Sequence, residues 1–259
     1  MEHENQTYVQ KALEFIKTEG ILEKLQEHGE PLFLMLSGAH NFGFPSKDSD
    51  MDIRGVYFAP TTNFLDLDSK QKKVFEYMSD DRNLDVSVDE LRHYLQLVSN
   101  SNGNRIEWPF SELIIYQSQD FENLKKTIQE SAICKKTFDH YLHFARDMWD
   151  GKTKEEGVKK DLYALRVYMT GITLLEEEII CSDIKRLNQR FGEEIEPMLK
   201  TKYDCEKNLS QGYDRRKLSQ VIQSLDDRII LAHQNSNLPD YPDTEKINEY
   251  HRNFRIDKL

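Results

Sequence analysis

Apolar runs in the first third of the chain predict a small β-sheet. The continuous run from Leu32 to Leu36 indicates a buried strand, which ends at a turn of small residues. A second strand is expected to open at Asp50 and Asp52. Alternation of apolar and polar residues from Lys72 to Met78 predicts a third strand. The segment from Leu84 to Val88 is predicted to form the strand that follows it and runs back. The predicted sheet therefore occupies residues 32–88.

Helical periodicity precedes and follows this sheet. Residues 5–27 are expected to be helical, with a break at Gly20. Ser87 and Glu90 have the spacing of a capping box, which predicts a helix start directly after the last strand. That helix carries an apolar stripe at Leu91, Tyr94, Leu95 and Val98.

The second half of the chain is predicted to be helical from Asp120 onward. A long helix is expected between Glu155 and Cys181, because apolar residues recur there with a helical period, at Leu162, Leu165, Met169, Ile172, Leu175 and Ile179. A second face of this helix carries Lys159, Tyr163, Arg166 and Thr170. That face is either simply solvated or directed toward a ligand.

Two carboxylates mark the start of the second strand. Asp50 and Asp52 stand two residues apart, and alternate side chains of a strand share one face of the sheet. Two oxygen ligands at this spacing suit Mg²⁺, which fills its remaining positions with water and substrate phosphates. The preceding turn, which includes Gly38, is expected to leave backbone N–H groups available for phosphate oxygens.

A third carboxylate, Asp85, lies between Leu84 and Val86 on the returning strand. A charge between apolar neighbours is costly unless it is exposed or paired. Asp85 therefore either faces water on a half-exposed strand or is compensated by a metal ion. The pattern places it at a strand end just before a helix.

The order of these features resembles the signature of the DNA polymerase β-like nucleotidyltransferase superfamily, in which two acidic residues separated by one follow a glycine turn. The longer pattern G-x-x-x-x-G…S-D-x-D-x-R-G-V, from Gly38 to Val56, is similar to a bacterial branch named after an RNA repair pathway. The resemblance implies an α+β fold, with a small mixed nucleotidyltransferase sheet and flanking helices. It implies a catalytic domain over residues 1–117 and an all-helical domain, binding substrate and nucleotide, over residues 118–259.

The resemblance also implies a reaction. A nucleoside monophosphate would move from an NTP such as ATP to an acceptor hydroxyl, with an RNA 3′ end favoured, and pyrophosphate would be released. Mg²⁺ or Mn²⁺ would be held by the catalytic residues Asp50, Asp52 and Asp85. Nucleotide contacts would come from two regions, namely Gly38, Ala39, His40 and Ser49 near the turn and Lys159, Tyr163 and Arg166 on the long helix.

One residue departs from the family pattern. Ala39 stands where the usual serine would offer its hydroxyl to a terminal phosphate. Losing a hydrogen bond to a charged group costs about 1.5–3 kcal/mol. A catalytically weak or inactive relative with a binding or regulatory role, similar to an antitoxin, is therefore the alternative to an active enzyme.

Composition and charge limit the functions that the chain can have. The chain has 259 residues and a formal net charge of −11, whereas nucleic-acid binders usually present a basic face. This acidity weakens an RNA role without excluding a local basic groove. Cys134, Cys181 and Cys205 lack metal-binding spacing, and no apolar run is long enough to span a membrane. The polar N-terminus does not resemble a signal peptide. The three widely spaced cysteines make a disulfide framework unlikely, so a reducing, cytoplasmic location is expected.

Overall fold

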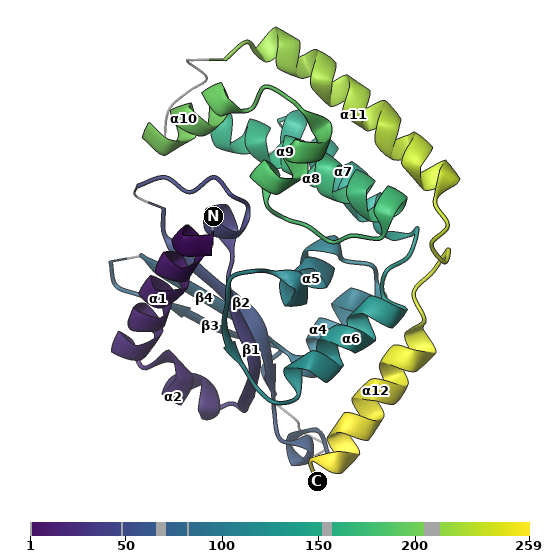
Figure 1. The fold of residues 1–259 in the computed structure, drawn as a ribbon. Helices are drawn as coiled ribbons and strands as arrows, with labels where there is room; N and C mark the ends of the chain where they lie inside the picture. The colour runs from purple at the N-terminus through teal and green to yellow at the C-terminus, as the bar shows by residue number, and fades with distance from the viewer. Residues whose placement is uncertain (1, 48, 66–70, 82, 152–156, 205–212) are drawn as a thin grey trace. The chain divides into compact units, whose positions relative to one another are not determined.

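The computed structural model describes residues 2–47, 49–65, 71–81, 83–151, 157–204 and 213–259 (Figure 1). These residues form two compact units, each discontinuous in sequence. The first, here the sheet unit, comprises residues 1–38, 50–133 and 242–259. The second, here the helical unit, comprises residues 39–49 and 134–241. The domain boundary predicted between residues 117 and 118 stays a prediction. In the structure, residues 39–49 belong to the helical unit, and residues 118–133 and 242–259 belong to the sheet unit.

The sheet unit is built on a mixed five-stranded sheet of order β3-β4-β2-β1-β5. Strand β1 (Glu30–Leu36) pairs antiparallel with β2 (Met51–Phe58) and with β5 (Ile114–Gln117). Strand β4 (Leu84–Glu90) pairs parallel with β2 and antiparallel with β3 (Val74–Met78). The expected α+β fold with a small mixed sheet is confirmed.

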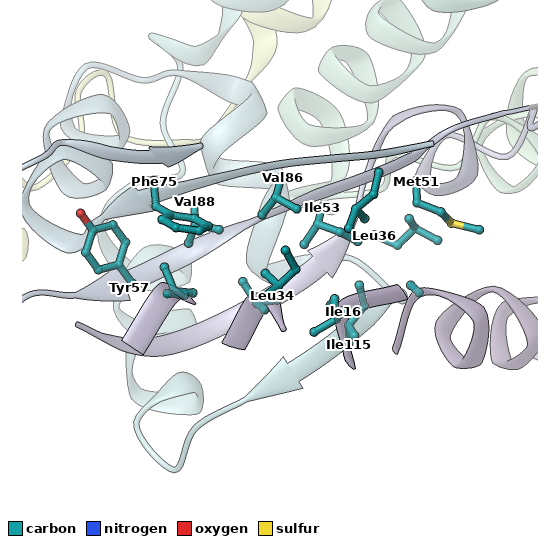
Figure 2. Packing of buried hydrophobic residues seen from close by; sticks show 14 of the residues in the cluster. Ile16, Leu34, Leu36, Met51, Ile53, Tyr57, Phe75, Val86, Val88 and Ile115 are labelled. Carbon is teal, nitrogen blue, oxygen red and sulfur yellow. The ribbon is translucent and has the colours of Figure 1, made fainter. Parts of the chain in front are cut away.

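One face of the sheet is covered by two N-terminal helices, α1 (Glu2–Thr18) and α2 (Ile21–Gln26). The predicted break between them is confirmed at Gly20, whose φ is +59°. Buried side chains from these helices and the sheet form one apolar cluster, shown in part in Figure 2, which includes Ile16, Leu34, Ile53 and Val86. Residues next to these on the strands, such as Asp52 and Asp85, therefore face the other side of the sheet.

Helices α4 (Leu91–Ser99) and α6 (Phe121–Ser131) cover that other side. Phe33 of β1 contacts Tyr94 of α4 and Phe121 of α6, with ring centroids 6.4 and 5.1 Å away. The C-terminal helix α12 (Thr244–Asp257) packs against both helices. Short turns complete the unit, namely η1 (Thr61–Phe64), α5 (Gly103–Glu107) and η2 (Trp108–Phe110).

The capping box predicted at Ser87 is wrong. Strand β4 continues through Ser87, which pairs with Arg54 of β2 and Glu76 of β3, and ends at Glu90. Glu90 is itself the N-cap of α4, because its side chain accepts a hydrogen bond from the Arg92 backbone N–H at 2.7 Å. The expectation that Asp85 lies just before a helix is therefore also wrong, since it is the second residue of β4 and the helix begins only at Leu91.

The helical unit is organised around α8 (Val158–Glu177), whose side chains are buried on almost every side. Around it pack α7 (Thr137–Trp149), α9 (Ile184–Phe191), α10 (Glu196–Asp204) and α11 (Arg215–Asn235). The predicted stripe from Leu162 to Leu175 is buried, but Ile179 lies beyond the helix end and is 51% exposed. Residues 155 and 156 of the predicted helix lie outside the described residues.

A hydrogen-bonded cluster around Asp226 of α11 is the basis of a first prediction. Arg146 of α7 donates two hydrogen bonds of 2.7 Å to Asp226, and the Tyr168 hydroxyl donates a third of 2.7 Å. We expect Asp226→Asn to lower the free energy of unfolding by about 1.5–3 kcal/mol at neutral pH. Hydrogen bonds from Arg146 are the main reason that the pKa of Asp226 is lowered. The contribution of the carboxylate is therefore complete above its unfolded pKa and is lost as the pH falls through the lower folded value.

Urea titrations of both proteins at neutral pH and at about pH 3 test this, since the difference should shrink in acid. Asp227→Asn is the matched control, because Asp227 is exposed and accepts a single hydrogen bond from Gln223. An undiminished difference in acid, or an equal loss in the control, would contradict the assignment.

The structure also describes the cysteines and the possible membrane spans. Of the cysteines, Cys134 is buried, Cys181 is half-buried and Cys205 lies outside the described residues. Within the described ranges, no helix combines the length and apolar character needed to cross a membrane.

Candidate functional site

The parallel pairing of β2 with β4 brings two of the predicted carboxylates together. Asp52 and Asp85 are direct partners in the register of these strands. Both side chains lie on the sheet face opposite α1 and α2, and they are 22% and 32% exposed. Two carboxylates on adjacent strands, both accessible to solvent, therefore stand side by side.

Arg54 joins these two carboxylates. Its Nη2 lies 3.1 Å from Asp52 Oδ1 and 2.8 Å from Asp85 Oδ2. Its Nη1 donates to the backbone carbonyls of Ile53 and Asp85 at 2.9 and 3.1 Å. Charge-assisted hydrogen bonds of this kind fix side-chain orientation strongly. Sequence reasoning gave Arg54 no role, although its position two residues after Asp52 places it on the same face.

Gly38 lies directly against Asp52. Its φ is +60°, and a Cβ built there would lie 1.9 Å from Asp52 Oδ2, so no other residue fits without displacement. The backbone N–H of Ser37 also donates to the Asp52 carbonyl at 2.7 Å. One oxygen of the carboxylate thus bonds to Arg54, while the other lies beneath the glycine turn.

This donor set suits a hydrated divalent cation. Magnesium needs only one or two protein carboxylates when substrate phosphates and water complete its shell. Among the described residues, no group of three or more His, Cys, Asp or Glu side chains is arranged to hold a metal ion. Asp52 and Asp85 therefore fit as two ligands of a cation whose remaining coordination positions would be filled by phosphate and water.

Asp50 differs from this pair. It is exposed and lies one residue before β2, where the N–H of Met51 donates to the Asn83 carbonyl at 2.8 Å. In the described part of the chain, the ion pairs of Arg54 include Asp52 and Asp85 but not Asp50. Its role as a third metal ligand stays a prediction.

The residues after Gly38 belong to the helical unit. The short helix α3 (Gly38–Asn41) buries Ala39 and His40, which are 6% and 8% exposed. Their carbonyls accept hydrogen bonds from Phe44 and Gly43 at 3.0 and 3.3 Å. Farther along, the Ser49 hydroxyl accepts from the Ser46 N–H at 2.9 Å. Nucleotide contacts by Ala39, His40 and Ser49 stay predictions.

The predicted face of α8 packs against residues that follow α3. The ring of Tyr163 makes edge contacts with Phe42 and Phe44, with both centroid distances 5.2 Å. The guanidinium of Arg166 lies 4.1 Å above the Phe42 ring, and its side chain is 0% exposed. Lys159 is half-buried. The binding roles of Lys159, Tyr163 and Arg166 stay predictions.

A family model described as the RNA repair pathway DNA polymerase beta family matches residues 8–253. The chain belongs to this family. The resemblance to this branch of the DNA polymerase β-like superfamily, stated from Gly38 to Val56, is thereby confirmed.

Curated relatives extend the comparison. The chain is 31% identical over 228 residues to the uncharacterised protein MJ0002 of Methanocaldococcus jannaschii, covering 84% of this chain and 90% of that protein. It is also 31% identical over 140 residues to the uncharacterised protein YcgL of Bacillus subtilis, covering 52% of each. Among solved structures, it is similar to a nucleotidyltransferase-like protein from Exiguobacterium sibiricum. That match has a TM-score of 0.33 and 14% identity, and it covers 91% of this chain and 79% of the other.

Proposed function

We propose that the chain is a metal-dependent nucleotidyltransferase that transfers a nucleoside monophosphate from an NTP to an acceptor hydroxyl. The observation that carries the proposal is the in-register pairing of Asp52 with Asp85, whose carboxylates share Arg54 beside the Gly38 turn. Family membership supports the same reaction class. An RNA 3′ end is the favoured acceptor, because the family is named for RNA repair.

The chain's own residues would act through position and charge. Asp52 and Asp85, together with Asp50, would hold Mg²⁺ or Mn²⁺. Such an ion, when bound, neutralises developing negative charge and favours ionisation of an attacking hydroxyl. Arg54 keeps the two paired carboxylates in a fixed orientation, and the backbone N–H groups of the turn after Gly38 would receive phosphate oxygens.

The proposed reaction replaces one phosphorus–oxygen bond with another and involves no oxidation or reduction. The acceptor oxygen forms a bond to the α-phosphorus of the NTP while the bond from that phosphorus to the bridging β-phosphate oxygen breaks. Pyrophosphate leaves with the bonding electron pair. Asp85 takes the proton of the acceptor hydroxyl and passes it to solvent. Little covalent chemistry falls to the protein, so catalysis depends on positioning and electrostatic stabilisation.

Incubation with each labelled NTP, Mg²⁺ or Mn²⁺ and pooled RNA tests this function. Transfer of label to RNA supports the complete proposal, and transfer to the protein itself supports the reaction with a different acceptor. Absence of transfer from all four nucleotides with either metal, using protein whose folding is verified, would contradict it.

The alternative function, binding or regulation without catalysis, is favoured by Ala39. If a triphosphate lies as the family resemblance implies, Ala39→Ser should tighten NTP binding or raise turnover about tenfold through one charge-assisted hydrogen bond. Titration of NTP in the presence of Mg²⁺, combined with transfer assays, measures both effects. Ala39→Gly is the matched control, since it retains the N–H without adding a hydroxyl. Unchanged affinity would contradict the phosphate position, and background transfer by both proteins would favour the binding role.

A further inference from the structure

A polar groove lies between α4 and α12 in the sheet unit. Its volume is about 470 Å³, within the range of small-molecule sites. The polar side chains that line it include Arg92, Gln96, Asn100, Asn248 and His251. Neither an aspartate nor a glutamate is among its lining residues, although the chain carries a net charge of −11.

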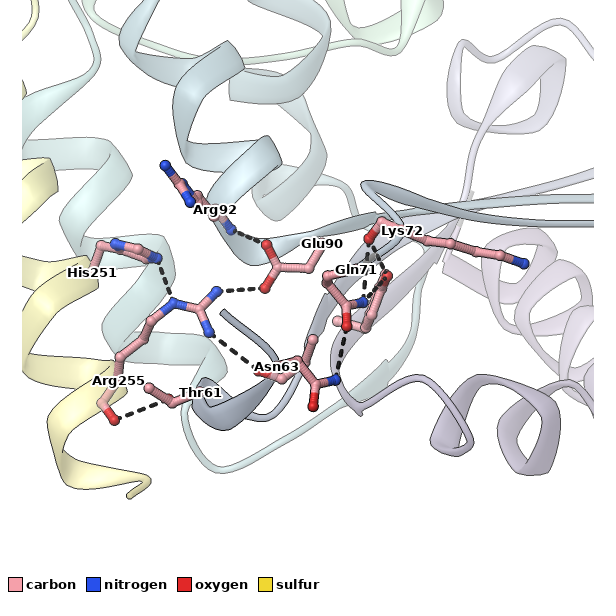
Figure 3. Close-up of polar contacts among 10 residues, drawn as sticks. Thr61, Asn63, Gln71, Lys72, Glu90, Arg92, His251 and Arg255 are labelled. Atoms are coloured by element: carbon pink, nitrogen blue, oxygen red, sulfur yellow. Dashed lines mark hydrogen bonds and ion pairs between the residues drawn. The ribbon is translucent and has the colours of Figure 1, made fainter. Parts of the chain in front are cut away.

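A buried ion pair fixes the imidazole of this groove. Arg255 is 8% exposed, and its Nη2 lies 2.6 Å from Glu90 Oε1 (Figure 3). Its Nη1 donates to the Ala59 carbonyl at 3.1 Å, and its Nε donates to His251 Nε2 at 2.7 Å. A guanidinium group only donates hydrogen bonds, so His251 Nε2 must accept and cannot carry a proton. The neutral ring therefore carries its proton on Nδ1.

The charge state of His251 agrees with this geometry. Burial is the largest cause that lowers its pKa to about 4, and the positive charges of Arg255 and Arg92 lower it further. At neutral pH the ring is thus uncharged and has one fixed donor, Nδ1–H. Because His251 lines the groove and makes its described hydrogen bond through Nε2, this donor is available to a ligand.

Other residues that line the groove provide a positive charge, amide groups and apolar surface. Arg92 is exposed, and among the described residues its guanidinium takes part in no ion pair. Gln96, Asn100 and Asn248 each provide a donor and an acceptor, as the edges of bases require. Apolar surface in the same groove comes from Leu95 and Ile247.

We propose that this groove binds a nucleotide, with the phosphate at Arg92 and His251 and the base and ribose among the three amide side chains. A phosphate satisfies two groups that can only donate, and a base satisfies amides that both donate and accept. The volume suits one nucleotide unit. That unit is either a free mononucleotide or one residue of an RNA strand.

This site is separate from the candidate catalytic pair. Asp85 is the second residue of β4 and Glu90 is its last, so the two mark opposite ends of the strand, roughly 17 Å apart at the usual rise per residue. The groove lies beyond the Glu90 end. Its occupancy therefore needs neither Asp52 nor a metal ion, and it does not depend on the proposed reaction.

Isothermal titration with AMP, GMP, CMP, UMP and a short oligoribonucleotide, all in EDTA, tests the proposal. We expect saturable binding that Asp52→Asn leaves unchanged and that Arg92→Gln or Asn248→Ala weakens about tenfold. Arg252→Gln is the matched control and should retain binding, because Arg252 lies on α12 with Asn248 but pairs with Glu245. Nitrogen NMR of the histidine rings should show a protonated His251 Nδ1 whose signal shifts on binding.

Each outcome is decisive. Binding of a mononucleotide supports a free nucleotide as the occupant, and binding of the oligoribonucleotide alone supports an RNA strand. Inorganic phosphate that binds as tightly as any nucleotide would overturn the nucleotide assignment in favour of a simple anion site. Absence of saturable binding, or equal affinity in Arg92→Gln and Arg252→Gln, would overturn the proposal.

Discussion

Asp52→Asn should abolish nucleotidyl transfer while leaving the fold intact. The substitution keeps the shape of the side chain and removes the charge that Arg54 and a metal would meet. Loss of about 4 kcal/mol of electrostatic stabilisation corresponds to roughly a thousandfold lower rate. The measurement is the initial rate of label transfer at saturating NTP, alongside the midpoint of thermal unfolding.

The control for this variant is Asp80→Asn, because Asp80 is an exposed carboxylate in the turn before β4. It should transfer label at the wild-type rate. A folded Asp52→Asn protein that still transfers label at more than a tenth of that rate would refute the role of the carboxylate pair.

The largest loss of stability is expected from Arg255→Met. This variant retains much of the packing of the side chain against Phe58 and Phe64 but leaves Glu90 buried without its partner. Removing one partner of a buried ion pair costs about 3–5 kcal/mol. Because stability of a domain is only about 5–15 kcal/mol, unfolding in urea should begin at a visibly lower concentration.

A matched surface pair tests whether burial is the cause. Arg252→Met breaks the exposed pair with Glu245 on the same helix, and exposed pairs contribute about 0–1 kcal/mol. Restoring neutrality in the double variant Arg255→Met with Glu90→Gln should recover part of the loss. Equal destabilisation by Arg255→Met and Arg252→Met would contradict the explanation.

The strands of the site were predictable because their apolar patterns are local. The run at Leu32 to Leu36 and the alternation before Met78 each identify a strand from neighbouring residues alone. The end of β4 was missed because Ser87 and Glu90 have helix-capping spacing, whereas pairing with β2 and β3 extends the strand to Glu90. Local propensity is routinely overridden by such tertiary pairing.

The surroundings of individual side chains were not predictable in the same way. Periodicity correctly placed Tyr163 and Arg166 on α8, but it could not show that Phe42 and Phe44, from a distant part of the sequence, pack over them. Likewise, the spacing of Asp52 and Arg54 indicates a shared face, while the bridge to Asp85 depends on which strands become neighbours. Strand order is a property of the whole chain and leaves no local pattern.

The register of β2 against β4 has a consequence for length variation. Asp52 and Asp85 are held opposite each other by strand pairing, so the distance between them is independent of how many residues connect the two strands. Insertions in that connection are expected to be tolerated, because loop closure costs only about 0.6 kcal/mol for each doubling of length. A single residue inserted between Asp85 and Val86 would instead turn the carboxylate toward the opposite face of the sheet, because the rest of β4 keeps its register with β2. Relatives of very different total length can therefore retain one and the same carboxylate pair.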